Sequence, residues 1–217
     1  MSHSRIFPDR HAAALALAQR LAPYRGQRPL ILAIPRGAVP MAQAIAEALG
    51  GDMDVVLVRK LSAPFSPEYA VGAVAENGWT WISPHAQAAG ANAAWIESEK
   101  RRQMALLQER RKRYTPFRHA IDPAGRIVIV VDDGLATGAT MTAALHAVRA
   151  HHPARLVCAV PVAAPDSLAR VEGLADEVVC LEAPEDFSAV GQFYGRFDQV
   201  DDAQVEDILA AQAGAQP

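Results

Sequence analysis

Two adjacent carboxylates at the end of an apolar run are the strongest chemical signal in the sequence. Asp132 and Asp133 follow the run RIVIVV, residues 126–131. Burying an isolated charge costs on the order of several kcal/mol, so both carboxylates should meet solvent, a cation or hydroxyl groups. A vicinal diol, such as the 2′ and 3′ hydroxyls of a ribose, is a good partner for such acceptors.

The turn after the two aspartates offers groups that can hold a phosphate. ATGAT, residues 136–140, leads into a predicted helix at residues 138–151. The first N–H groups of a helix have no partner within it, and the helix dipole favours an anion there. Thr137 and Thr140 add hydroxyl donors. The spacing is neither that of a Walker A loop nor that of the G-x-G-x-x-G motif, and the alternative is an ordinary strand-to-helix turn with a threonine cap.

Two further stretches place cations at turns. In AIPRGAVP, Arg36 and Gly37 stand between a strand and a helix, where a guanidinium beside free N–H groups suits a diphosphate. In VRKLSAPFSPE, Arg59 and Lys60 precede a proline-rich stretch, which predicts an exposed loop at residues 61–70. Taken alone, the first stretch could be a proline-bounded turn with a surface arginine, and the second a solvated strand end.

The elements that must position these groups alternate along the chain. Short runs that are apolar at nearly every position predict strands covered on both faces, and hence a parallel sheet. The predicted strands are residues 29–34, 53–58, 126–131, 155–160 and 176–181, and the predicted helices are residues 9–22, 38–49, 138–151, 165–174 and 201–211. This order predicts an open α/β fold, a mainly parallel twisted sheet with helices on both faces. Ligands of such sheets bind at the carboxyl ends of the strands.

Two segments interrupt this alternation. Residues 69–83 predict a hairpin, because the Asn77-Gly78 pair favours a tight turn with positive φ. Residues 85–115 predict one long helix whose second half is basic. The simplest interpretation of that charge is a solvated helix face.

Length and composition are those of an ordinary folded protein. The 217 residues predict one domain, 1–217, with a core of about 26–182. A hydrophobic content of 51% with 21% charged residues excludes disorder, and a net charge of −3 creates no field toward nucleic acid or membrane. Cys158 and Cys180 lie in apolar runs and are predicted core residues. With no apolar run of membrane-spanning length and no signal-peptide pattern, we expect a cytoplasmic protein.

Residues 127–141 resemble the phosphoribosyl pyrophosphate (PRPP) motif of the type I phosphoribosyltransferases: a hydrophobic run, two acids, small residues, then Thr-Gly-x-Thr. The resemblance runs from the first predicted strand to the last, with the family's elements in order. It implies a Mg²⁺-dependent enzyme that moves the 5-phosphoribosyl group from PRPP to a nitrogenous acceptor and releases pyrophosphate. Within the family, the chain is most similar to bacterial phosphoribosyltransferases whose acceptor is unassigned.

The resemblance also implies a role for each matching residue. Asp132 and Asp133 would hold the ribose hydroxyls, partly through magnesium and water, and would act in catalysis with Lys60. The 5′-phosphate would lie on the turn, at Ala136, Thr137, Gly138, Ala139 and Thr140. Pyrophosphate would be held by a short loop, which in the family often has a non-proline cis peptide before a glycine, and by the basic strand end; the residues are Arg36, Gly37, Arg59 and Lys60. Loop 61–70 would close over the site.

One departure from the family concerns the acceptor. Purine-salvage members carry an aspartate just before Thr-Gly that can act as acid or base, whereas this chain has Ala136, which cannot transfer a proton. A 6-oxopurine acceptor is therefore disfavoured, unless the proton is handled elsewhere or the nucleophile is already neutral. A hood over C1′ would select the acceptor, and its candidates are residues 1–25, 85–118 and 183–200. The first candidate includes Phe7. In the last, four aromatic side chains could stack on a base or pack onto the core: Phe187, Phe193, Tyr194 and Phe197.

The sequence leaves two alternative functions open. A regulatory protein of the same fold could sense PRPP or nucleotides and bind RNA through the basic residues 100–113. The negative net charge, the few aromatic residues there and the three intact PRPP elements disfavour it. A PRPP synthase would need an ATP site, for which the sequence has no motif. The expected partners are PRPP, a small nitrogenous acceptor and a second copy in a homodimer, with no membrane and no nucleic acid.

Overall fold

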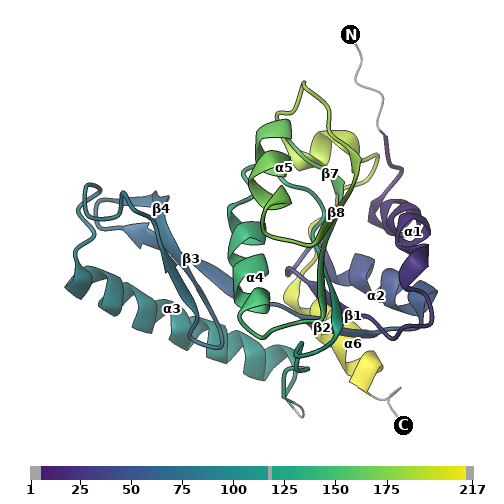
Figure 1. Ribbon diagram of the computed structural model, residues 1–217, viewed down its shortest axis with the longest axis horizontal. Helices are drawn as coiled ribbons and strands as arrows, with labels where there is room; N and C mark the ends of the chain where they lie inside the picture. Colours follow the sequence, from purple (N-terminus) through teal and green to yellow (C-terminus); the bar gives the residue numbers. More distant parts are fainter. Residues whose placement is uncertain (1–5, 117–118, 214–217) are drawn as a thin grey trace.

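The computed structural model describes residues 6–116 and 119–213, and its body is a sheet of five parallel strands (Figure 1). The strand order is β2-β1-β6-β7-β8, and every neighbouring pair is parallel. The strands are β1 (Leu30–Ala33), β2 (Asp52–Val55), β6 (Ile127–Val131), β7 (Arg155–Val162) and β8 (Glu177–Glu182). The parallel α/β sheet predicted from the apolar runs is therefore confirmed.

Helices cover both faces of this sheet. They are α1 (Arg10–Arg20), α2 (Val39–Leu49), α4 (Ala139–Arg149), α5 (Pro165–Glu172) and α6 (Asp202–Ala213), with short 3₁₀ turns at Ala22–Tyr24 and Val190–Phe193. Side chains alternate along each strand, so Ile31 and Ile129 pack with α1, α2 and α6, whereas Leu32 and Val130 pack with α4 and α5. The sheet thus has one apolar cluster on each face. None of the helices in the described residues is long and apolar enough to cross a membrane.

A second, smaller sheet and one long helix extend from the body, and we call this part the arm, residues 58–114 (Figure 1). Its strands β3 (Val58–Ala63), β4 (Ser66–Ala75) and β5 (Thr80–Ile82) are antiparallel, and α3 (Ala93–Tyr114) packs against them. The predicted hairpin is present between β4 and β5, and Gly78 in its turn has a φ of 85°. The helix predicted from residue 85 begins only at Ala93, where the Asn92 side chain caps it.

Two expectations for the arm are wrong. The predicted strand 53–58 is two strands, because β2 ends at Val55 and the chain leaves the main sheet before β3. The exposed loop predicted at residues 61–70 is a hairpin of β3 and β4 that turns at residues 64–65. The pairing passes from Ser62↔Ala70 to Ala63↔Ser66, a β-bulge that leaves residues 67–69 outside the register. A bulge of this kind accommodates proline in a strand, which a continuous ladder would not.

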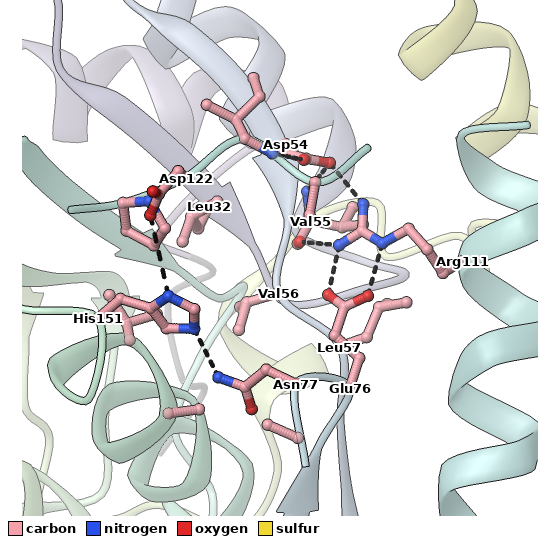
Figure 2. Close-up of a pocket in the computed structure, with 16 residues that line it drawn as sticks. Leu32, Asp54, Val55, Val56, Leu57, Glu76, Asn77, Arg111, Asp122 and His151 are labelled. Carbon is pink, nitrogen blue, oxygen red and sulfur yellow. Dashed lines mark hydrogen bonds and ion pairs between the residues drawn. The ribbon is translucent and has the colours of Figure 1, made fainter. Parts of the chain in front are cut away.

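Arg111 of α3 fastens the arm to the body (Figure 2). Its guanidinium donates to Asp54 Oδ1 at 2.9 Å, to the Val55 carbonyl at 2.8 Å and to both carboxylate oxygens of Glu76. Asp54 is only 1% exposed and also accepts from the Ile121 amide at 2.9 Å. Burial lowers the pKa of Arg111, but the Glu76 and Asp54 carboxylates outweigh burial and raise it. The solvated face expected for the basic stretch is therefore wrong at this residue.

Candidate functional site

The loops that follow β1 and β6 meet at the carboxyl edge of the sheet. These strands are direct neighbours, with Ala33 paired to Val131, so the predicted pyrophosphate loop and the two predicted acids start side by side. A Cβ atom placed on Gly37 would lie 2.0 Å from Asp133 Oδ2, which means that only glycine allows this approach. The peptide bond between Pro35 and Arg36 is cis, one bond before the expected position.

The two aspartates have different surroundings. Asp132 accepts a hydrogen bond from the Asp133 amide at 2.9 Å. Burial, and then the neighbouring Asp133 charge, raise the pKa of Asp132 well above its usual value. Burial also raises the pKa of Asp133, although Arg10 opposes this effect. Because both carboxylates hold charge at a cost, this edge of the sheet favours a bound cation or hydroxyl donors.

Arg10 is a site residue that the sequence analysis missed. Its Nε and Nη2 atoms donate to Asp133 Oδ2 at 3.0 and 2.8 Å, and its Nη1 atom donates to the Asp198 carbonyl at 2.6 Å. The guanidinium lies 3.8 Å from the centre of the Phe197 ring. One signal in the sequence could have found it. Arg10 is the first residue of α1, after the N-cap Asp9, and a cation at a helix N-terminus is unfavourable unless a nearby anion compensates it.

The predicted phosphate turn is held in place by α5. Ser167 donates to the Ala136 carbonyl at 2.7 Å, and Arg170 donates to the Thr137 carbonyl at 3.1 Å. Gly138 caps α4 with a φ of 70°, a conformation that favours glycine. The residues around it are exposed, and they are Ala136, Thr137, Ala139 and Thr140. The arrangement presents a helix N-terminus and two hydroxyls to solvent, as a phosphate site requires.

Two of the predicted basic residues, Arg36 and Arg59, lie around the start of α6. Arg36 Nη1 is 3.9 Å from Asp202 Oδ2. Arg59 lies in β3 of the arm and donates through Nε to the Gln103 side chain of α3, and it lines the same cavity as Asp202. Lys60 is exposed. Because successive side chains of a strand point to opposite faces, Lys60 does not share the direction of Arg59.

Most of the aromatic residues of the predicted hood pack against the rest of the protein and are not open to a ligand. Phe7, Phe193 and Tyr194 are at most 7% exposed, and the Phe7 and Tyr194 rings lie 5.6 Å apart. The Tyr194 hydroxyl donates to the Asp133 carbonyl at 2.7 Å, and Phe7 forms a parallel bridge with Tyr194, so segments far apart in the sequence meet beside the acids. Of the aromatic set, Phe187 packs on Phe193, and Phe197 remains 36% exposed over Arg10.

The donor atoms at this edge suit magnesium that arrives with a substrate. In the described residues no group of three or more His, Cys, Asp or Glu side chains could hold a metal ion alone. Mg²⁺ is commonly bound through one or two carboxylates together with substrate phosphates. Asp132 and Asp133 provide such carboxylates beside a phosphate turn.

Gly37→Ala is expected to lower the free energy of unfolding by about 1–3 kcal/mol, the usual cost of overpacking. The new methyl group would displace the Asp133 carboxylate, which cannot move without losing its bonds to Arg10. Urea denaturation measures the change. Gly173→Ala is the matched control, since a Cβ there meets nothing within 4 Å. Equal stability of both variants would show that the contact between the loops is loose.

Comparisons with known proteins come from both sequence and structure. A family model, "Phosphoribosyl transferase domain", matches residues 9–196. "Putative phosphoribosyl transferase Rv0571c" of Mycobacterium tuberculosis H37Rv is 43% identical over 206 residues, which are 94% of this chain and 46% of that protein. The same figures hold for "Putative phosphoribosyl transferase MT0597" of strain CDC 1551, so the chain spans about half the length of the curated relatives it matches. The crystal structure of TT1426 from Thermus thermophilus is similar with a TM-score of 0.85 and 46% identity, over 95% of this chain and 98% of that one.

Proposed function

Because the chain belongs to the phosphoribosyl transferase family, we propose that it moves the 5-phosphoribosyl group from PRPP to a nitrogenous acceptor and releases pyrophosphate. The contact between Gly37 and Asp133 is the observation that carries this proposal. It joins the loop expected to bind pyrophosphate to the acids expected to bind ribose, and C1′ of PRPP lies between those two groups.

The phosphate and ribose would be held by separate parts of the site. The 5′-phosphate would bind the turn at residues 136–140, where helix N–H groups and threonine hydroxyls favour an anion. Asp132 and Asp133 would accept hydrogen bonds from the ribose hydroxyls. Their negative charge would also stabilise the positive charge that develops on the ribose ring when the leaving group departs. Arg10 would keep Asp133 oriented.

The leaving group would be stabilised by cations. Arg36 and Arg59 would neutralise the charge that develops on pyrophosphate. Bound with PRPP beside Asp132 and Asp133, magnesium would supply a further positive charge on the diphosphate. Lys60 lies on the other face of β3 and would reach the leaving group only after the arm moves.

Water must be kept from C1′, since its attack would consume the donor. We assign this role to the β3–β4 hairpin, which replaces the loop expected at residues 61–70. Phe65 at its tip is 92% exposed, an apolar side chain that a closed arm would cover. The homodimer, the single domain and the cytoplasmic location stay predictions. RNA binding is not proposed, because Arg111 of the basic stretch serves to anchor the arm.

Titration calorimetry with PRPP and Mg²⁺, followed by a screen of purines, pyrimidines and small amines for pyrophosphate release, tests the proposal. We expect PRPP to bind and at least one nitrogenous acceptor to release pyrophosphate. A folded protein that binds no PRPP would contradict the proposed function. PRPP binding without turnover of any acceptor would favour a sensing role.

Hypoxanthine, guanine and xanthine are expected to be poor acceptors. Proton transfer by a placed side chain is worth about 10²–10⁴-fold in rate, and Ala136 cannot provide it. Its carbonyl accepts a hydrogen bond from Ser167 of α5, which holds this part of the turn in place. Ala136→Asp is expected to weaken PRPP binding, because a new carboxylate would face the bound phosphate and the two aspartates. Steady-state pyrophosphate release with each base measures both effects, and efficient turnover of guanine by the wild type would overturn this expectation.

A further inference from the structure

Arginine side chains gather around a cavity between the arm and the start of α6. The cavity measures about 210 Å³. Its lining residues come from β3, α3 and α6, and they are Arg59, Leu106, Glu109, Arg110, Arg113, Tyr114 and Asp202. Arg36 of the predicted pyrophosphate loop reaches the same place, because it lies 3.9 Å from Asp202. Of the residues expected to bind pyrophosphate, Arg59 of the arm thus lines this cavity, and Arg36 of the body lies beside Asp202, which also lines it.

Positive charge in this cluster is only partly compensated. In the described part of the chain, neither Arg59 nor Arg110 has a carboxylate within ion-pair distance, although Glu109 also lines the cavity. Burial, and then the charges of Arg110 and Arg102, lower the pKa of Arg59. Like charges that repel one another in a partly buried cavity make a favourable place for an anion.

Two carboxylates of α6 already lie beside these arginines, since Glu206 pairs with Arg113 Nε and Asp202 lies near Arg36 and Arg113. Asp202 accepts from the Tyr114 hydroxyl at 2.5 Å and lies 3.3 Å from Arg113 Nη1. The Tyr114 hydrogen bond lowers the pKa of Asp202, with further lowering by Arg113, Arg36 and Arg110, while burial opposes it. Both carboxylates act mainly on Arg113, whereas pyrophosphate supplies several charges and can bridge Arg59 and Arg110 as well.

We propose that this cavity receives the pyrophosphate group, with Arg110 and Arg113 as binding residues beside Arg36 and Arg59, and that Asp202 holds the position until phosphate displaces it. This inference rests on the proposed function. Asp202, the first residue of α6, would then compete with the leaving group for the arginines. PRPP and released pyrophosphate would therefore bind less tightly than they would if Asp202 were absent. Weaker retention of pyrophosphate would ease its release after transfer.

Titration calorimetry with pyrophosphate and Mg²⁺ tests whether Asp202 competes with pyrophosphate. Asp202→Asn is expected to bind roughly three- to tenfold more tightly than the wild type, because a like charge beside the bound anion is gone. Asparagine can still accept from Tyr114, so the fold should persist, which the unfolding temperature checks. Asp207→Asn is the matched control, since Asp207 is exposed on the same helix, and its affinity should equal that of the wild type. Equal pyrophosphate affinity of Asp202→Asn and the wild type would overturn the proposed competition between Asp202 and pyrophosphate.

A second pair of variants tests the cavity itself. Arg110→Gln is expected to weaken pyrophosphate binding about tenfold, the loss of one charge-assisted contact. Arg101→Gln removes the same charge from an exposed position of α3 and should bind as the wild type does. Unchanged affinity of Arg110→Gln, or no pyrophosphate binding by the wild type, would overturn the inference. A PRPP titration of the wild type then tests the proposed function separately. The predicted phosphate turn and the two aspartates would still bind PRPP if the cavity did not bind pyrophosphate.

Discussion

Replacing Asp132 and Asp133 together by asparagine is expected to abolish measurable PRPP turnover while the protein stays folded. Removing one charge-stabilising group from an active site typically costs on the order of 10²–10³-fold in rate, and here two are lost. Stability should not fall in parallel, because burial already penalises the charge of both carboxylates. The asparagine introduced at position 133 could still accept from Arg10, which also keeps its bond to the Asp198 carbonyl.

Titration calorimetry with PRPP and Mg²⁺ and an assay of pyrophosphate release measure this loss, with circular dichroism as the test of folding. Glu47 near the end of α2 and Asp207 of α6 are exposed, so the double variant Glu47→Gln, Asp207→Asn removes the same charge away from the site. That control should bind PRPP as the wild type does. A folded Asp132→Asn, Asp133→Asn protein with unchanged PRPP affinity would refute the role of the two acids.

Arg111→Met is expected to lower the free energy of unfolding by about 3–5 kcal/mol, the usual cost of leaving a buried charge without its partner. Asp54 would keep its carboxylate at 1% exposure and lose the guanidinium, although the Val55 and Ile121 amides would still donate to it. Glu76 would lose both of its bonds to the guanidinium.

Urea denaturation of the wild type and two variants measures this change. Arg101→Met alters an exposed arginine of the same helix and should change stability by less than about 0.5 kcal/mol. Adding Glu76→Gln to Arg111→Met should restore part of the loss, because one uncompensated carboxylate is gone. A loss below about 1 kcal/mol for Arg111→Met would mean that the arm is not anchored at this residue.

The sequence predicted what depends on local pattern. Strands buried on both faces are apolar at nearly every position, so β1, β6, β7 and β8 could be recognised, whereas β2, which carries Asp52 and Asp54, was predicted only as part of a longer strand. The motif at residues 127–141 is contiguous, and a strand, a turn and a helix start necessarily bring its residues together. The loop at 61–70 was a wrong prediction because its prolines indicated a break in the strands, whereas Pro64 lies in the tight turn of a hairpin and Pro67 in a β-bulge.

Contacts between distant segments could not be predicted in this way. Arg10 and Asp133 are 123 residues apart, and their pairing depends on how α1 packs on the sheet. Arg111 looks like its basic neighbours in the sequence. The inner face of α3 carries Glu99, Gln103 and Leu107, a stripe of mostly polar residues that apolar periodicity does not detect. The arginine cluster around Asp202 likewise needs the arm and α6 to meet.

The alternation of side chains across the sheet separates the two acids. Asp132 continues the row of Val130 and lies near Cys158, whose pKa burial and Asp132 raise to about 12, on the face covered by α4 and α5. Asp133 continues the row of Val131 and pairs with Arg10 of α1, on the opposite face. Each acid therefore belongs to a different layer of the molecule. A substitution in the layer around Arg10 would therefore act on Asp133 first, and one in the layer around α4 and α5 would act on Asp132 and the predicted phosphate turn.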